Sequence, residues 1–145
     1  MSNAANGGRR YLPTLAELID RLCIVLLKSI FVPEHHNNYL QEAVDIEHDI
    51  DLALTGRAGN LHAREVRAIL MLAISNRFIW ENEAKARNGG NEQDKLLKLT
   101  HSINGVRNAA KNVIATAGGE RVDLKIDCLA ADLPAEGGNW RGVLG

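Results

Sequence analysis

Apolar residues recur at intervals of three and four along four long stretches of this 145-residue chain. This period is that of an α-helix, because a half-buried strand would alternate apolar and polar residues. Residues that stop helices separate the stretches, at Pro33, Gly56–Gly59, Gly89–Gly90 and Gly118–Gly119. Short connections place consecutive helices side by side and antiparallel. The pattern therefore predicts an all-α fold: an antiparallel bundle of four main helices with a short C-terminal element.

The length and composition of the chain indicate one domain with an aliphatic core. Apolar residues make up 46% of the sequence and aromatic residues only 4%, so Leu, Ile, Val and Ala must fill the core. We expect a flexible N-terminus over residues 1–12, a single helical domain over 13–133 and a flexible C-terminal tail over 134–145, with Trp140 as a candidate anchor. Residues 122–133 fit either a strand or a short helix, and we prefer a short helix or a packed extended arm.

Local signals place the helix ends. Thr14 and Glu17 form a capping box at the start of the first helix. Asn60 is expected to cap the third helix and Asn91 the fourth. Asp20 is a hydrophilic exception in the otherwise apolar first helix. One line of the third helix carries Val66, Ile69, Leu70, Ala73, Arg77 and Trp80, with Leu72, Asn76, Ile79 and Glu83 beside it.

Charge and cysteine content limit the classes of function. The formal net charge is −1, which makes nucleic-acid binding an unfavoured interpretation and leaves little repulsion against self-association. We therefore expect a homo-oligomer. The apolar run Leu22–Phe31 is too short to span a bilayer, and we find no secretory signal. Cys23 and Cys128 belong to no CxxC motif, which suits a reducing compartment, so we expect a cytoplasmic protein.

The candidate site is a set of polar side chains on the facing helices three and four. Their spacings of three and four put them on one helix face, and their types have directed hydrogen-bond geometry. The set comprises Asn76, Trp80, Glu83 and Arg87 on the third helix and His101, Asn104, Arg107 and Asn108 on the fourth.

Two interpretations of this polar set remain open. In the first, Arg107 or Arg87 binds an anion such as a phosphate, asparagine side chains orient it, and Trp80 offers a stacking surface to a base. In the second, the set is a structural hydrogen-bond network that fixes helix register. Neither interpretation assigns a catalytic residue.

The same residues carry a resemblance to a known family. The pattern Asn76-x-x-x-Trp80-x-x-Glu83 with Arg87, followed by Asn104-x-x-Arg107-Asn108, resembles the bacterial family called domain of unknown function 4254. The resemblance covers the four helices and implies an all-helical cytosolic protein. It implies no reaction. The chain has Asn82 where that family tends to carry an acidic residue.

The leading functional hypothesis is a small binding protein, homo-oligomeric, that takes a small anionic ligand or nucleotide in the polar pocket between helices three and four. It needs no cofactor, and a phage or mobile-element accessory protein would suit the small size. The first alternative is a magnesium-dependent all-α nucleotide phosphohydrolase, with Glu47, Asp51 and Glu83 as metal ligands. The second alternative is a structural or assembly protein.

Overall fold

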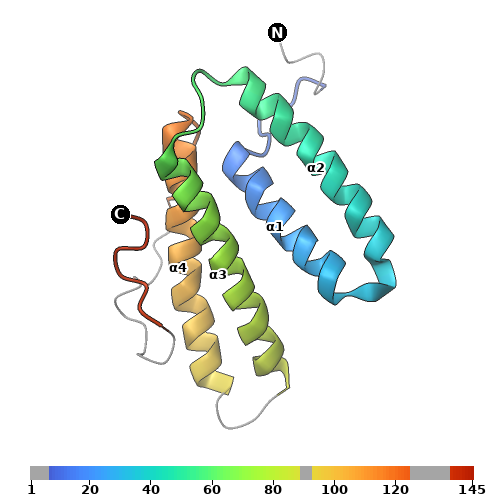
Figure 1. Ribbon diagram of the computed structural model, residues 1–145, viewed down its shortest axis with the longest axis vertical. Helices are drawn as coiled ribbons and strands as arrows, with labels where there is room; N and C mark the ends of the chain where they lie inside the picture. Colours follow the sequence, from blue (N-terminus) through green and yellow to red (C-terminus); the bar gives the residue numbers. More distant parts are fainter. Residues whose placement is uncertain (1–6, 89–92, 125–137) are drawn as a thin grey trace.

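The computed structural model describes residues 7–88, 93–124 and 138–145. The predicted all-α fold is confirmed, because the described residues form helices and no strand. The elements are α1 (Leu15–Phe31), a short 3-10 turn η2 (Pro33–His35), α2 (His36–Gly56), α3 (Ala63–Arg87) and α4 (Gln93–Ala117) (Figure 1).

The helices are arranged as two antiparallel hairpins. α1 packs along α2, and α3 packs along α4, while contacts between the hairpins are fewer and run through α1. Figure 1 shows α1 between α2 and the α3–α4 pair. α2 and α3 are scarcely in contact, although they follow each other in the chain. α1 therefore lies between α2 and the second hairpin and makes most of the contacts between the two hairpins.

The start of α1 is fixed by its own cap and by the end of α4. Thr14 Oγ1 accepts a hydrogen bond from the backbone N–H of Glu17 at 3.2 Å, as the capping box predicts. The N–H of Leu15 donates to both carboxylate oxygens of Glu120, at 3.0 and 3.2 Å. An acidic group there also favours the positive end of the helix dipole. The first hairpin is thus tied to the residues that follow α4.

The cap of α3 differs from the expectation. His62, not Asn60, is the N-cap, because Glu65 returns its carboxylate to the His62 N–H at 3.2 Å and completes a capping box. The same carboxylate forms two hydrogen bonds with the Arg57 guanidinium, at 2.7 and 3.0 Å. Both side chains are almost fully buried. This ion pair fixes the connection between the hairpins. The expected Asn91 cap of α4 lies outside the described residues.

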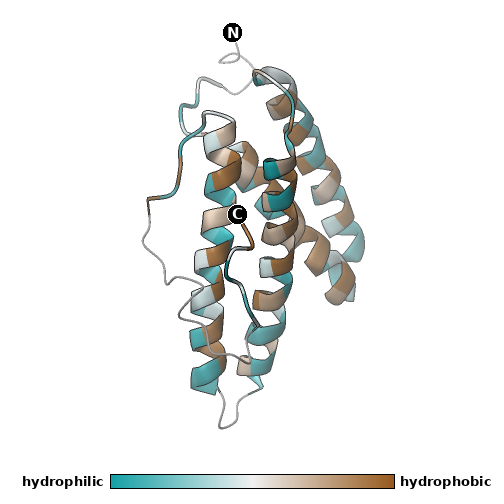
Figure 2. Ribbon diagram, turned by 60° about the vertical axis from the view of Figure 1, so that its left-hand side comes forward, coloured by the Kyte–Doolittle hydropathy of each residue, from teal (hydrophilic) through white to brown (hydrophobic). Residues whose placement is uncertain are grey.

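Three groups of apolar side chains form the core. The largest joins α1, α3 and α4. A second lies between α3 and α4, in the half of that pair nearer to the end of α3. The third holds α1 against α2. Their buried members are Leu15, Ala16, Ala68, Leu72, Ala110, Ile114 and Ala115; Ile79, Ile103, Val106 and Trp140; and Val25, Ala43 and Ile46. Figure 2 shows the corresponding alternation of apolar and polar residues along the helices.

The end of the chain lies along α3. Trp140 is buried and packs edge-on against Phe78, with ring centroids 5.5 Å apart. Arg64 donates to the Leu144 carbonyl, and Arg67 donates to the carbonyls of Val143 and Gly142. The tail expected to be flexible is thus held against α3 over residues 138–145. The short C-terminal element expected over 122–133 lies mostly outside the described residues.

The apolar line expected along α3 is only partly buried: Ile69 packs against the core, whereas Val66 and Leu70 are exposed, as is Ile74, which the expected line did not include. Val66, Leu70 and Ile74 are 46, 58 and 51% exposed. The buried face of α3 lies on the opposite side of the helix and carries Glu65, Ala68, Leu72, Ser75, Asn76, Ile79, Asn82 and Ala86. Small residues on that face allow α4 to approach closely, so α3 buries its more polar side and leaves an apolar side in solvent.

Candidate functional site

A buried carboxylate on α1 lies at the centre of the polar residues. Asp20 is 6% exposed and faces the seam where α1 meets α3 and α4. Asn76 on α3 donates its amide N–H to Asp20 Oδ1 at 2.8 Å. Arg107 on α4 donates Nε–H to the same oxygen at 3.0 Å and Nη2–H to Oδ2. One carboxylate thus joins three helices.

Two further side chains complete this group, which we call the Asp20 cluster: Asp20, Asn76, Asn104, Arg107 and Lys111. Asn104 Oδ1 accepts a hydrogen bond from Arg107 Nη1 at 3.3 Å. The Lys111 ammonium lies 4.0 Å from Asp20 Oδ2. Two cations therefore surround one carboxylate in a partly buried setting, where charged hydrogen bonds are stronger than in water.

Cys23 borders the cluster one helical turn beyond Asp20. Its thiol is partly buried, and this burial raises the pKa of the thiol above its ordinary value. A hydrogen bond with Asn76 offsets part of that increase. The neutral thiol is therefore favoured, which indicates a packing role rather than a nucleophile.

The structure brings together three of the eight predicted site residues around an unpredicted partner. Asn76, Asn104 and Arg107 belong to the Asp20 cluster, and Asp20 supplies the anion that we had expected from a ligand. Asp20 was visible in the sequence only as a charged residue in an apolar helix. Its partners lie 56 and 87 residues away, so local spacing could not identify them.

The other predicted site residues lie outside the Asp20 cluster. Trp80 packs against Phe31 at the end of α1, with ring centroids 6.1 Å apart. Glu83, Arg87 and His101 are exposed, whereas Asn108 is half-buried. The residues expected to line one pocket between α3 and α4 therefore do not lie together: some belong to the buried Asp20 cluster, and the others lie outside it.

The described part of the chain contains no group of three His, Cys, Asp or Glu side chains arranged to hold a metal ion. Glu47 and Asp51 lie exposed on α2, and Glu83 lies exposed on α3. Across these same described residues, no helix combines the length and apolarity needed to cross a membrane.

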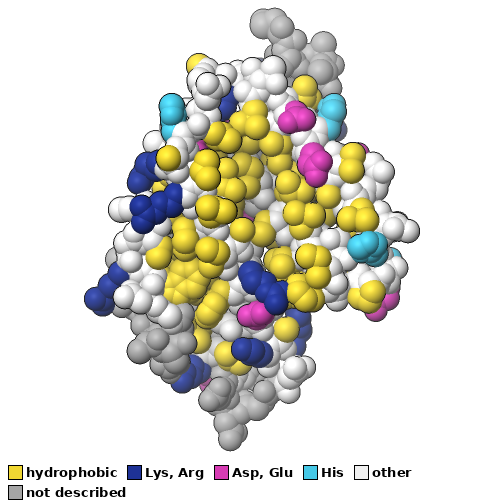
Figure 3. Space-filling model, in the orientation of Figure 1, with side chains coloured by type: hydrophobic (Ala, Val, Ile, Leu, Met, Phe, Trp, Pro, Cys, Tyr) yellow, Lys and Arg dark blue, Asp and Glu magenta, His cyan; other side chains and the backbone are white. Residues whose placement is uncertain are grey.

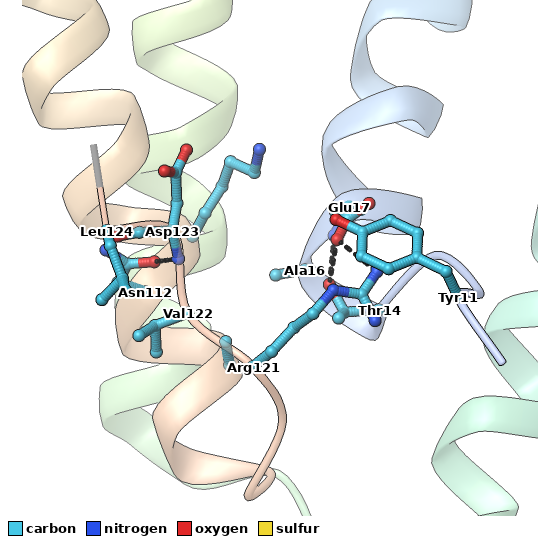
Figure 4. A pocket seen from close by; sticks show the side chains of 11 residues that line it. Tyr11, Thr14, Ala16, Glu17, Asn112, Arg121, Val122, Asp123 and Leu124 are labelled. Carbon is cyan, nitrogen blue, oxygen red and sulfur yellow. Dashed lines mark hydrogen bonds and ion pairs between the residues drawn. The ribbon is translucent and has the colours of Figure 1, made fainter.

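A cavity of about 510 Å³ opens beside the cluster, between the start of α1 and the end of α4. Lys111 lines it and so connects it to Asp20. Arg121 stacks on the Tyr11 ring, 3.9 Å from its centroid, and pairs with Glu17 at 3.0 Å. Figure 4 shows Arg121 extending toward Tyr11 and Glu17 from the opposite wall. The cavity is polar and open to solvent.

A second candidate site is an exposed apolar surface of α3, which includes Val66 and Leu70 from the line that the sequence pattern assigned to the core. Val66, Leu70 and Ile74, which we call the α3 apolar stripe, are four residues apart and form one continuous ridge. Figure 3 shows hydrophobic side chains spread over the middle of the face that is seen in the orientation of Figure 1. Exposed apolar residues of the first hairpin include Leu26 and Leu52, at 41 and 60%.

Comparison of the chain with models of protein families, with curated proteins and with solved structures finds no match. The resemblance to domain of unknown function 4254 therefore stays a prediction.

Proposed function

We propose that this protein is a non-enzymatic helical assembly module that binds a protein chain through the α3 apolar stripe. The observation that carries the proposal is the exposure of Val66, Leu70 and Ile74 as one ridge. Single exposed apolar residues are ordinary on soluble proteins, but a contiguous patch is typical of an interaction surface.

The state of the polar residues supports this proposal. Arg107 makes three hydrogen bonds inside the protein, to Asp20 and Asn104, so its guanidinium is largely occupied. Asn76 is also bonded to Asp20. These side chains favour the network interpretation, in which they hold the two hairpins together and so fix the position of α3 against α1.

The test places a photocrosslinking amino acid at Leu70 in the producing cell and identifies the crosslinked species by mass spectrometry. We expect crosslinks to protein at this position. The matched control is Leu97, an apolar residue of α4 with 49% exposure that is not part of the stripe. Equal or absent crosslinking at the two positions would refute the proposal.

A second candidate function is binding of a small anionic ligand in the cavity beside the Asp20 cluster. It is favoured by Lys111 and Arg121, two cations that line the cavity from different segments. A thermal-shift screen of nucleotides and phosphorylated metabolites, with and without magnesium, tests it, because a ligand stabilises the state it binds. A shift that survives in Lys111→Met and Arg121→Met would place the ligand elsewhere.

A further inference from the structure

We infer that the side of α3 covered by the tail, residues 138–145, is a peptide-recognition site and that the tail is its built-in occupant. The contact is autoinhibitory, because a segment of another protein with the same chemistry binds only where the tail has left. This side of α3 carries Arg64, Arg67 and Phe78 and is not the α3 apolar stripe. The inference therefore goes beyond the proposed function and does not depend on it.

One aromatic side chain anchors the tail. Trp140 is 9% exposed, whereas Arg141 and Gly142 beside it lie exposed to solvent. Figure 2 shows the tail, which ends at the C label, lying over the α3–α4 pair. The tryptophan packs there in an apolar group whose other buried members are Ile79, Ile103 and Val106. A tryptophan buried in this way typically carries a large share of the binding energy at an interface.

Two arginines of α3 hold the tail by its backbone. Arg64 Nη1 donates to the Leu144 carbonyl at 2.9 Å. Arg67 donates Nε–H to the Val143 carbonyl at 2.8 Å and Nη2–H to the Gly142 carbonyl at 2.9 Å. Hydrogen bonds from a charged guanidinium are stronger than those between neutral groups. Because these bonds recognise carbonyl oxygens, which every peptide has, they can hold the backbone of another segment equally well.

These two guanidiniums have no other charged partner within the part of the chain that the structure describes. Arg57, Arg77 and Arg107 each pair with a carboxylate of the helices. Arg64 and Arg67, by contrast, donate their hydrogen bonds to the tail. They are therefore committed to binding a peptide backbone and not to packing one helix against another.

The backbone of the tail adds a sequence requirement. Gly142 has a φ of 70°, in the left-handed region, and a Cβ built on it would lie in open space. Glycine is therefore favoured there by the backbone conformation and not by a lack of room. The N–H of Gly145 closes the turn on the Gly142 carbonyl at 3.1 Å. The site thus selects a peptide in which tryptophan is followed two residues later by glycine.

The tail can leave while the helices stay folded, because its polar contacts are exposed. The bonds from Arg64 and Arg67 lie at the surface, where water replaces a lost partner. The buried members of the other two apolar groups all belong to the region before the tail. Segments with few buried apolar contacts and exposed hydrogen bonds open before the rest of a protein. As part of the same chain, the tail competes with a free peptide at a high effective concentration.

The first experiment measures binding of a fluorescently labelled synthetic peptide with the sequence of residues 138–145, by fluorescence anisotropy. The proteins are the parent 145-residue chain and its Trp140→Ala variant, whose own tail has lost its anchor. We expect the variant to bind the peptide at least about tenfold more tightly than the parent, because loss of a buried tryptophan anchor weakens the competing tail. The same peptide with alanine in place of tryptophan should not bind.

The second experiment tests the recognition chemistry in the Trp140→Ala background. Arg67→Gln removes two bonds to the peptide backbone and should weaken binding at least about tenfold. Arg121→Gln is the matched control, because this arginine also donates to a backbone carbonyl, that of Leu12, away from the tail. It should leave binding unchanged. A peptide with Gly142→Ala should bind about tenfold more weakly, since alanine disfavours the left-handed conformation.

Circular dichroism establishes that the variants remain folded. If Trp140→Ala does not fold, Gly142→Ala of the whole chain takes its place, because this exposed change weakens the tail without opening a cavity. It should bind the unaltered peptide about tenfold more tightly than the parent does. A folded variant that binds no peptide at millimolar concentration overturns the inference, and so does binding that Arg67→Gln leaves unchanged. Loss of the fold in both variants also overturns it, because the tail would then be part of the core.

Discussion

The two sides of α3 reverse the usual division between core and surface. The inward side buries Glu65, Ser75, Asn76 and Asn82, whereas the outward side exposes the α3 apolar stripe. Each buried charge or amide on the inward side costs free energy unless it finds a partner. Glu65 and Asn76 have such partners in Arg57 and Asp20. The inward side thus holds partnered polar groups, and the outward side leaves apolar surface in contact with solvent.

The difference shows that composition alone does not decide which side of a helix is buried. Ala68 and Ser75 let α4 approach α3 closely, which longer side chains would prevent. The larger residues Val66, Leu70 and Ile74 could equally fill a core, but they are exposed. The following variants test each side in turn.

The largest effect is expected from Glu65→Ala. The change leaves the Arg57 guanidinium buried without its carboxylate and removes the α3 capping box. Loss of one partner of a buried ion pair destabilises a protein by about 3–5 kcal/mol. Urea denaturation followed by circular dichroism measures the loss. Glu81→Ala breaks the exposed Arg77–Glu81 pair of the same helix and should cost less than about 1 kcal/mol. Equal losses would contradict the special role of the inward side.

Asp20→Ala is expected to have the second largest effect, a loss of about 3 kcal/mol in the free energy of unfolding. This is the lower end of the range for a broken buried ion pair, because Arg107 keeps some access to solvent. It removes the acceptor for Arg107 and Asn76 and so loosens the joint between the hairpins. The measurement is again the free energy of unfolding. Glu42→Ala, which breaks the exposed pair with Arg21, is the matched control on the same hairpin. A smaller loss for Asp20→Ala than for this control would show that the cluster is not structural.

Acid should lower the free energy of unfolding, because it weakens the buried ion pair between Arg57 and Glu65 on the inward side of α3. The Arg57 guanidinium lowers the pKa of Glu65 below its ordinary value of 4.5. Because the folded-state pKa is depressed, the stabilisation is present above the unfolded pKa and is lost as pH falls through the folded pKa. Unfolding free energies measured between neutral and acidic pH should therefore fall less steeply in Glu65→Gln than in the parent chain. Parallel curves would exclude this ion pair as a source of acid sensitivity.

The smallest effect should come from the outward side. Leu70→Ala, measured at low protein concentration, should change the free energy of unfolding by no more than about 0.5 kcal/mol. Leu72→Ala, two residues away and fully buried, should cost about 2–5 kcal/mol. A large loss from Leu70→Ala at that dilution would mean that the stripe already packs within one copy.

The helices could be predicted from the sequence because their signals are local. The Thr14 capping box and the breaks at Pro33 and Gly56 give the bounds of α1 and the extent of α2. The α3 cap was misplaced at Asn60, although the spacing of His62 and Glu65 is that of a capping box. Histidine is not a typical member of that motif, so the signal was overlooked.

The site could be predicted only in part because it depends on contacts far apart in the sequence. Residue type marked Asn76 and Arg107 as unusual, but nothing local indicated that Asp20 would be their partner. On α3, Leu72 and Ile79 indicate one buried side, and Leu70 and Ile74 indicate another. Helical periodicity cannot predict which of these two sides is buried, because that depends on how α4 packs against α3.

The positions of the two tryptophans give the molecule two separate optical probes. Trp80 lies against Phe31, where the first hairpin meets the second, and Trp140 lies against Phe78, where the tail meets α3. In Trp140→Phe, the remaining emission reports separation of the hairpins, and in Trp80→Phe it reports release of the tail. Emission curves of the two variants, recorded in parallel denaturations, would therefore show whether the tail leaves before the hairpins part, without any added dye or label.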